Sequence, residues 1–186
     1  MNSYELKPSV DASQEFIEIA TDFSNPLDAI REAISNSFDA HAKILGIRFF
    51  SEKQYGERVL VVEFEDDGEG MDRGGLQAFF DLGNSLRRTD PEAIGEKGHG
   101  TKVFFNSSEV FVKTVRNGTK LEAVMLEPFK RLHDRELPKV SVVSAPTDEP
   151  NGTLIRIKGY NANRSDRFTH ALIKDYIMWF SKFGSF

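Results

Sequence analysis

Hydrophobic residues recur every three or four positions in several stretches of the chain, which is the spacing of an amphipathic helix. Asn25-Pro26 separates the first two stretches, and proline suits the first position of the second helix. A polar segment, 83–97, interrupts the pattern in the middle of the chain. The spacing predicts helices over 11–23, 26–40, roughly 74–82, roughly 100–107 and 166–183.

Other segments are rich in β-branched and aromatic residues, which is typical of strands. Asn117-Gly118 is a strong signal for a tight hairpin, and a polar segment with Gly56 joins the first two strands. Strands outnumber helices and hairpins connect them, so the sequence predicts an α+β fold, a two-layer α/β sandwich. Its sheet would be mixed but mostly antiparallel, with the helices on one face. The predicted strands are 43–50, 58–65, 108–115, 119–126, 139–145 and 153–158.

Length and composition favour a single folding unit over 1–186, because 186 residues with 39% hydrophobic content can build one core of ordinary size. The 16 Phe residues indicate that this core is aromatic. A formal charge of -5 argues against direct binding of nucleic acid or of an anionic membrane by this domain. The absence of Cys excludes disulfides, thiolate zinc sites and a cysteine nucleophile. Without an apolar leader or a membrane-spanning stretch, we expect a cytoplasmic protein.

A polar stripe marks one face of the helix predicted over 26–40. Glu32, Asn36 and Asp39 share this face, and the apolar residues of the helix lie on the opposite one. The stripe has two interpretations: it is the solvated side of an amphipathic helix, or it is a site. Asn36 occupies the position where an idle surface would carry Lys or Arg to pair with Glu32. A carboxylate and a neutral oxygen one turn apart suit a general base beside a hard cation.

Two glycine-rich segments follow the polar helix. The first, Asp66 to Met71, places acidic groups where the chain leaves a buried strand, although a simple glycine turn would look the same. The second, Gly95 to Lys102, opens a helix, so its backbone N–H groups could receive phosphate oxygens. The order Gly100-Thr101-Lys102 does not fit a P-loop, and neither segment has the Rossmann glycine spacing. No nucleophile elbow is present, and the four His are scattered without metal-ligand spacing.

Four motifs taken in order resemble the signature boxes of the GHKL ATPase superfamily, which includes DNA gyrase B, heat-shock chaperones, sensor histidine kinases and MutL. They are Glu32-x-x-x-Asn36-x-x-Asp39-Ala40, Asp66-x-Gly68-x-Gly70-Met71, Gly95-x-x-Gly98-x-Gly100 and Asn151-Gly152-Thr153. In motif style they are most similar to the MORC, MutL and gyrase branch. The resemblance covers roughly residues 26–158 and implies the Bergerat ATP-binding fold, in agreement with the predicted sandwich.

The resemblance implies a role for each matching residue. Asp66 would accept a hydrogen bond from the adenine amino group of ATP or ADP, and Thr153 would support the adenine through water. Asn36 would coordinate Mg²⁺, and Glu32 would deprotonate the water that attacks the γ-phosphate. Residues 83–97 would form the ATP lid. The other residues implied in nucleotide binding are Asp39, Gly68, Gly70, Met71, Gly95, Lys97, Gly98, His99, Gly100, Thr101 and Lys102, the last as a contact to a phosphate.

Two departures from the family pattern concern charge. Asp67 stands where the family usually has Asn, which puts an extra negative charge near the nucleotide. Leu86-Arg87-Arg88 follows the lid Ser where relatives tend to have Lys. Gyrase-like members also take a catalytic Lys or Arg from the domain that follows. We therefore expect that this chain is the N-terminal part of a longer protein and hydrolyses ATP slowly by itself.

The motifs favour a Mg²⁺-dependent ATPase module in which nucleotide closes the lid and drives association with a partner, a downstream domain or a second copy. A protein kinase of the same fold is the main alternative. Sensor histidine kinases usually begin the first box with Asn, so Glu32 counts against them, whereas serine/histidine-type kinases of the anti-sigma-factor kind can carry Glu. A nucleotide sensor without turnover and an interaction module with plain glycine turns also stay open.

Overall fold

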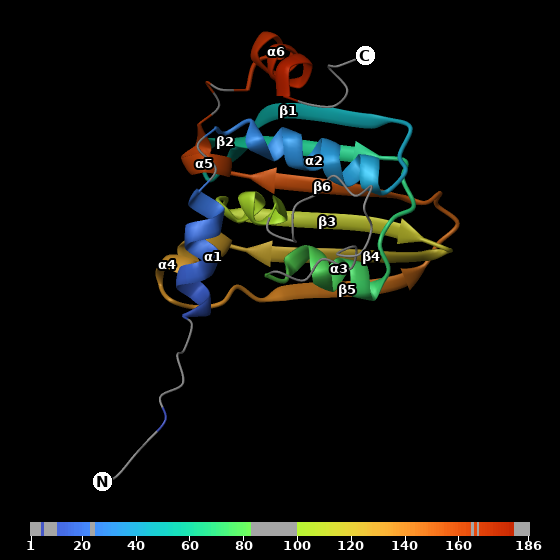
Figure 1. The fold of residues 1–186 in the computed structure, drawn as a ribbon, viewed down its shortest axis with the longest axis horizontal. Helices are drawn as coiled ribbons and strands as arrows, with labels where there is room; N and C mark the ends of the chain where they lie inside the picture. The colour runs from blue at the N-terminus through green and yellow to red at the C-terminus, as the bar shows by residue number, and fades with distance from the viewer. Residues whose placement is uncertain are drawn as a thin grey trace.

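One antiparallel sheet forms the back layer of the molecule (Figure 1). The computed structural model describes residues 5, 11–22, 25–82, 100–164, 166 and 168–180. Within these residues the strand order is β1-β2-β6-β3-β4-β5, and every neighbouring pair is antiparallel. The strands are β1 (Leu45–Gln54), β2 (Glu57–Asp66), β3 (Glu109–Arg116), β4 (Thr119–Leu126), β5 (Val140–Pro146) and β6 (Gly152–Lys158).

Helices cover one face of this sheet, which confirms the predicted α+β sandwich (Figure 1). Helix α2, which carries the predicted base Glu32 and the predicted Mg²⁺ ligand Asn36, lies in front of β2 and β6 in the picture. The last helix, α6, lies beside β1 and is tied to α2 because the Tyr176 hydroxyl donates to Asp28 Oδ1 at 2.5 Å. The helices are α1 (Ala12–Thr21), α2 (Asp28–Asp39), α3 (Arg73–Phe80), the 3₁₀-helix η1 (Gly100–Phe105), α4 (Pro128–His133), α5 (Tyr160–Asn163) and α6 (His170–Phe180).

The helices of the structure differ from the predicted ones in three respects. The segment predicted as an α-helix over 100–107 is the 3₁₀-helix η1. Two short helices, α4 and α5, were not predicted because six and four residues are too few to show a helical period. The C-terminal helix begins at His170 and not at residue 166.

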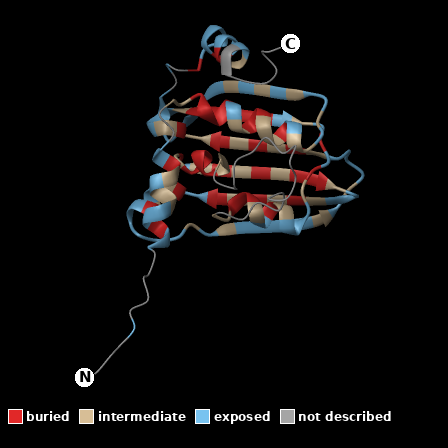
Figure 2. Cartoon of the chain, viewed as in Figure 1, coloured by how far each residue is buried: buried red, intermediate tan, exposed pale blue. Residues whose placement is uncertain are grey.

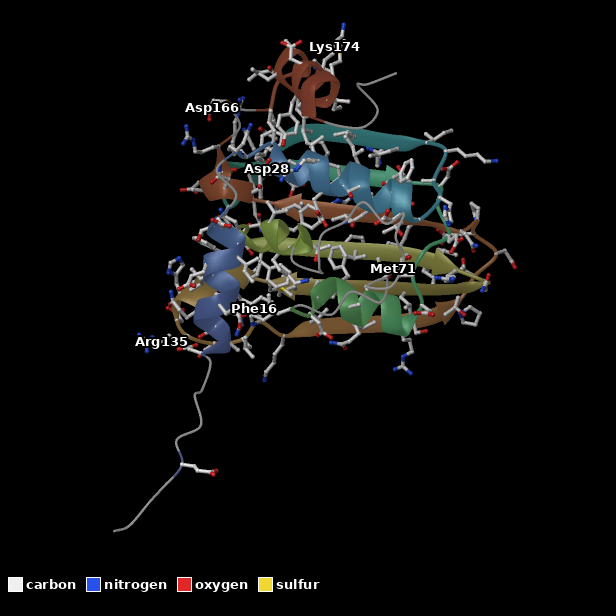
Figure 3. All side chains as sticks on the ribbon, viewed as in Figure 1. Phe16, Asp28, Met71, Arg135, Asp166 and Lys174 are labelled. Atoms are coloured by element: carbon white, nitrogen blue, oxygen red, sulfur yellow. The ribbon has the colours of Figure 1, made fainter. Side chains whose placement is uncertain are left out.

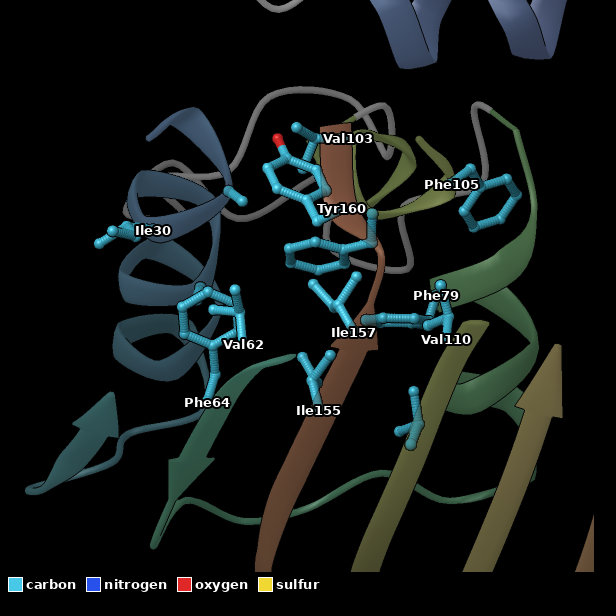
Figure 4. Close-up of a cluster of buried hydrophobic side chains, with 14 of the residues drawn as sticks. Ile30, Val62, Phe64, Phe79, Val103, Phe105, Val110, Ile155, Ile157 and Tyr160 are labelled. Atoms are coloured by element: carbon cyan, nitrogen blue, oxygen red, sulfur yellow. The ribbon is translucent and has the colours of Figure 1, made fainter. Parts of the chain in front are cut away.

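The core between the two layers is aromatic, as the composition suggests (Figure 4). Alternate residues of β2, including Val62 and Phe64, are buried under the helices, and the ring of Phe64 lies 6.0 Å from that of Phe104 of η1. Phe104 stacks on Phe79 of α3 with ring centroids 6.0 Å apart. Buried positions gather along the middle strands and the inner sides of the helices (Figure 2). This core fixes α2, α3 and η1 over the sheet.

The opposite face of the sheet is polar and internally paired. The Glu63 carboxylate accepts hydrogen bonds from Arg48 Nε at 2.9 Å and from Arg156 Nε at 2.6 Å, and the two arginines lie on the two neighbouring strands. Lys158 of β6 pairs with Glu52 of β1 at 2.9 Å, across the intervening strand β2. Alternating charges therefore satisfy one another on this face, and the candidate site lies on the helix-covered face. No helix among the described residues is long and apolar enough to span a bilayer.

Candidate functional site

The polar face of α2 brings Glu32 and Asn36 into direct contact. Asn36 Nδ2 donates to Glu32 Oε1 at 3.0 Å, which fixes both side chains one helical turn apart. This hydrogen bond uses Asn36 Nδ2 and Glu32 Oε1, so Asn36 Oδ1 and Glu32 Oε2 take no part in it. The arrangement offers a neutral oxygen ligand next to a carboxylate, as the sequence predicts. Asp39 lies half-buried one turn further on, and its charge contributes to the electrostatic field at Glu32.

Gly100 lies directly against the Glu32 carboxylate. A Cβ placed on Gly100 would overlap the Glu32 carboxyl group, so a larger residue at this position would displace the carboxylate. Burial raises the pKa of Glu32, while the hydrogen bond from Asn36 and the charge of Lys102 lower it. A carboxylate with a raised pKa is a stronger general base than one on the surface.

The loop after β2 lies beside the C-terminal half of α2. Glu69 N donates to Ala40 O at 2.9 Å, which joins the loop to the end of this helix. Asp66 Oδ1 accepts the Gly68 N–H at 2.9 Å, and Ser37 Oγ lies 3.5 Å from Asp66 Oδ2. Burial raises the pKa of Asp66, against these hydrogen bonds. Asp66 therefore lies beside α2 at Ser37, the residue that follows Asn36.

Asp67 has a structural role that the sequence does not reveal. Its Oδ1 accepts the N–H groups of Lys43 and Ile44 at 2.7 and 2.8 Å, and these bonds lower the pKa of Asp67. The carboxylate therefore caps the loop that enters β1. The negative charge of Asp67, which the sequence places near the nucleotide, is thus used in hydrogen bonds to the backbone of this loop.

Three polar side chains form a row across adjacent strands. Asp66 of β2 is in register with Thr153 of β6, and Thr153 is in register with Thr114 of β3. The hydroxyl oxygens of Thr153 and Thr114 lie 3.1 Å apart. Both threonines are buried, so the row forms the polar floor of the site on the helix-covered face of the sheet.

Thr114 also holds the glycine loop against the sheet. Met71 N donates to Thr114 Oγ1 at 2.7 Å, and Met71 lies at the end of the sheet where α2 ends (Figure 3). Gly70 has a φ of +70°, and a Cβ there would collide with the backbone of Val115. The loop therefore requires glycine at this position and a hydroxyl on the neighbouring strand.

Lys102 is fully buried, and its ammonium group is turned toward the end of α3. Nζ donates to Phe79 O and to Thr101 Oγ1, both at 2.8 Å, and the Thr101 hydroxyl lies 2.7 Å from the same carbonyl. Burial lowers the pKa of Lys102 to about 8, although the charges of Glu32 and Asp81 raise it. A phosphate contact by Lys102 would require the side chain to leave this position.

Part of the predicted site lies outside the described residues. This part comprises the lid over 83–97 and four residues of the third motif, Gly95, Lys97, Gly98 and His99. The remaining predicted residues gather between α2, the Asp66 to Met71 loop, η1 and β6. Sequence reasoning missed Ser37 and Thr114. The one available signal for Thr114 is a hydroxyl at an inward position of a strand, between buried valines.

Comparison with protein families gives a match over residues 23–149 to the model described as "Histidine kinase-, DNA gyrase B-, and HSP90-like ATPase". The chain belongs to this family of GHKL-type ATPases. The resemblance inferred from the four motifs is thereby confirmed. Comparison with curated protein sequences gives no match.

Solved structures of this GHKL-type fold include two topoisomerases. The ATPase region of Saccharomyces cerevisiae topoisomerase II has a TM-score of 0.56 at 12% identity, with 82% of this chain and 43% of that one covered. The ATPase and transducer domains of Balamuthia mandrillaris DNA topoisomerase II give 0.53 at 16%, with 73% and 37% covered. The N-terminal domain of a DNA repair protein gives 0.52 at 17%, with 90% and 43% covered. The chain thus spans 37% to 43% of the length of these structures.

The residues present fit a magnesium ion that arrives with a nucleotide. Among the described residues no group of three or more His, Cys, Asp or Glu could hold a metal alone. Mg²⁺ commonly takes one or two protein oxygens and completes its shell with phosphate oxygens and water. The side-chain oxygen of Asn36, Oδ1, takes no part in the hydrogen bond to Glu32 and can supply one of these protein oxygens.

Proposed function

We propose that this GHKL-type domain binds ATP with Mg²⁺ and hydrolyses its γ-phosphate, with Glu32 as the general base. The observation that carries the proposal is the Glu32–Asn36 hydrogen bond on α2, at 3.0 Å, in which Asn36 directly precedes Ser37, the residue whose hydroxyl contacts Asp66. The proposed base, Glu32, and the proposed cation ligand, Asn36, are thus held one helical turn apart, on the helix that also contacts Asp66.

The adenine end of the proposed site is the row of Asp66, Thr153 and Thr114. The Asp66 carboxylate can accept a hydrogen bond from the amino group of adenine, whereas guanine presents an acceptor at the corresponding position. Thr153, supported by Thr114 at 3.1 Å, can hold a water at the same edge of the base. This pairing supports a preference for ATP and ADP over GTP.

At the phosphate end, each protein group has a defined task. Glu32 Oε1 is occupied by Asn36, so Oε2 is the oxygen that can take a proton from the attacking water. Asn36 would hold Mg²⁺, which supplies charge neutralisation on the phosphates. The backbone at the start of η1, where Gly100 meets Glu32, lies beside the same carboxylate. Residue positioning of this kind is the main protein contribution to phosphoryl transfer.

The proposed function also includes a response of the protein to nucleotide binding. Nucleotide binding would close the lid over 83–97 and promote association with a partner, a downstream domain or a second copy. Family membership supports this step, and the motif style of the chain supports it further.

Phosphate release with Mg²⁺ and ATP tests the proposal. We expect slow turnover, below the enzyme median of about 10 s⁻¹, because the chain offers no fixed cation at the γ-phosphate among its described residues. Glu32→Gln should reduce turnover by about 10² to 10⁴-fold and leave ATP affinity, measured by calorimetry, nearly unchanged. Glu65→Gln is the matched control, since Glu65 lies beside Asp66 in sequence but on the opposite face. Undiminished turnover by the Glu32 variant would show that another group is the base.

A further inference from the structure

The sheet has two different edges. Beside β1 lies α6, where the ring of His170 is 4.9 Å from the ring of Phe49 (Figure 1). At the other margin, β5 has no neighbour beyond it among the described residues. β5 is therefore an edge strand with one unpaired row of backbone groups.

The composition of β5 differs from that of a protected edge. Its sequence, VSVVSAP, has no charged residue, whereas β1 contains Arg48, Glu52 and Lys53. Val142 and Val143 are 51% and 66% exposed on its two faces (Figure 2). Natural sheets usually discourage pairing at an edge with charged side chains, especially Lys. β5 itself has no such charge, and Lys139 directly precedes it.

The register with β4 identifies the backbone groups that point outward. Thr147 N donates to Gly118 O at 2.9 Å, and Pro146 is opposite Thr119. Thr147 therefore faces β4 through its backbone, and so do the residues at every second position before it, Val143 among them. The residues between them, Val140, Val142 and Ser144, direct N–H and C=O toward the free edge. Pro146 also falls in the outward row, where its missing N–H costs no bond to β4.

We propose that β5 pairs antiparallel with β5 of a second copy of this chain, with Val142 opposite Val142 on a two-fold axis. In this register Val140 of one copy faces Ser144 of the other, so each outward N–H meets a carbonyl. Pro138 faces Pro146 at both ends, which closes the ladder without leaving a donor unpaired. A register moved along the strand would place Pro146 opposite Val142 or Val140 and lose these bonds. The symmetry of the prolines about Val142 thus favours a second copy as the partner.

This surface is separate from the proposed nucleotide site. Two strands, β4 and β3, separate β5 from β6, which carries Thr153. Pairing at β5 should therefore not require ATP, unlike the nucleotide-driven association described above. The two associations can be told apart by adding and omitting Mg²⁺ and ATP.

Cysteine pairing tests the register directly, because the chain has no Cys of its own. Ser141 of one copy would face Val143 of the other in a pair without hydrogen bonds, with Cα atoms about 4.5 Å apart. This distance suits a disulfide. Two Ser141 residues would lie about 8 Å apart, and two Val143 residues as well, which is too far. A mixture of Ser141→Cys and Val143→Cys chains should therefore form a disulfide-linked dimer under mild oxidation, and neither variant alone should do so.

Sedimentation velocity over a concentration series completes the test. We expect a dimer without nucleotide that is lost in Val142→Pro, because this proline removes an outward N–H that β4 does not use. Val143→Thr is the control, since it alters an exposed apolar side chain and keeps the outward row. Its dimer should persist, and thermal melting should show that both variants stay folded. A monomer at every concentration, a dimer that needs ATP, a Val142→Pro dimer, or equal cross-linking in mixed and single samples would overturn the proposal.

Discussion

Replacing Thr114 by Val should weaken both the fold and the proposed adenine site. Val has nearly the shape of Thr, so the change removes hydrogen bonds without opening a cavity. Met71 N–H would lose an acceptor at 2.7 Å in a partly buried environment, at a cost of about 1–3 kcal/mol. The Thr153 hydroxyl would lose a partner at 3.1 Å, worth about 1 kcal/mol. The added methyl group would recover about 0.8 kcal/mol, which leaves a net loss of about 1–3 kcal/mol.

Urea denaturation of the free chain measures the stability change, and calorimetric titration with Mg²⁺-ATP measures the effect on the site. Thr114→Ser keeps the hydroxyl, so it should retain ATP affinity even though the loss of a buried methyl costs about 0.5–1.5 kcal/mol. Thr114→Val should weaken ATP binding by about tenfold, which corresponds to about 1.4 kcal/mol. A Val variant with unchanged stability and unchanged affinity would refute the role given to the Thr114 hydroxyl.

The other predictions concern the phosphate end of the site and the buried lysine. Asn36→Ala should weaken nucleotide binding in the presence of Mg²⁺ and have little effect in its absence, as titrations with and without EDTA would show; equal weakening in both would argue against a metal ligand. Gly100→Ala should lower turnover more than ADP affinity, because the added methyl group displaces the Glu32 carboxylate, and unchanged turnover would contradict that contact. Burial lowers the pKa of Lys102 from 10.5 to about 8, so between these values the unfolded chain binds more protons and stability rises with pH. The gain should be about 1–2 kcal/mol between pH 8 and about pH 9.5 in denaturation experiments, and Lys102→Met should abolish it.

Local patterns in the sequence were enough to predict the layers and the contact between Glu32 and Asn36. The helical period places Glu32 and Asn36 on one face of α2, and their hydrogen bond follows from that spacing. Strand alternation places Asp66 at the end of β2, where the chain must turn. These features depend only on residues close in sequence.

The rest depends on contacts between distant segments. Thr114 meets Thr153 because β3 and β6 are neighbours, and nothing in either strand specifies that pairing. Lys102 has the composition of a phosphate ligand, but its burial against Phe79 depends on how η1 packs on α3. The capping role of Asp67 likewise depends on the path of the loop before β1.

The central claim is that Asp66 recognises adenine in a nucleotide site, and calorimetric titration of the chain with Mg²⁺-ATP and Mg²⁺-GTP tests it most directly. We predict saturable binding of ATP, little binding of GTP, and loss of the ATP signal in Asp66→Asn. Asp67→Asn is the matched control, because the Asp67 carboxylate is bound to the loop at Lys43 and Ile44, and this variant should bind ATP as the parent chain does. Equal binding of both nucleotides, no binding of either, or full ATP binding by Asp66→Asn would contradict the account.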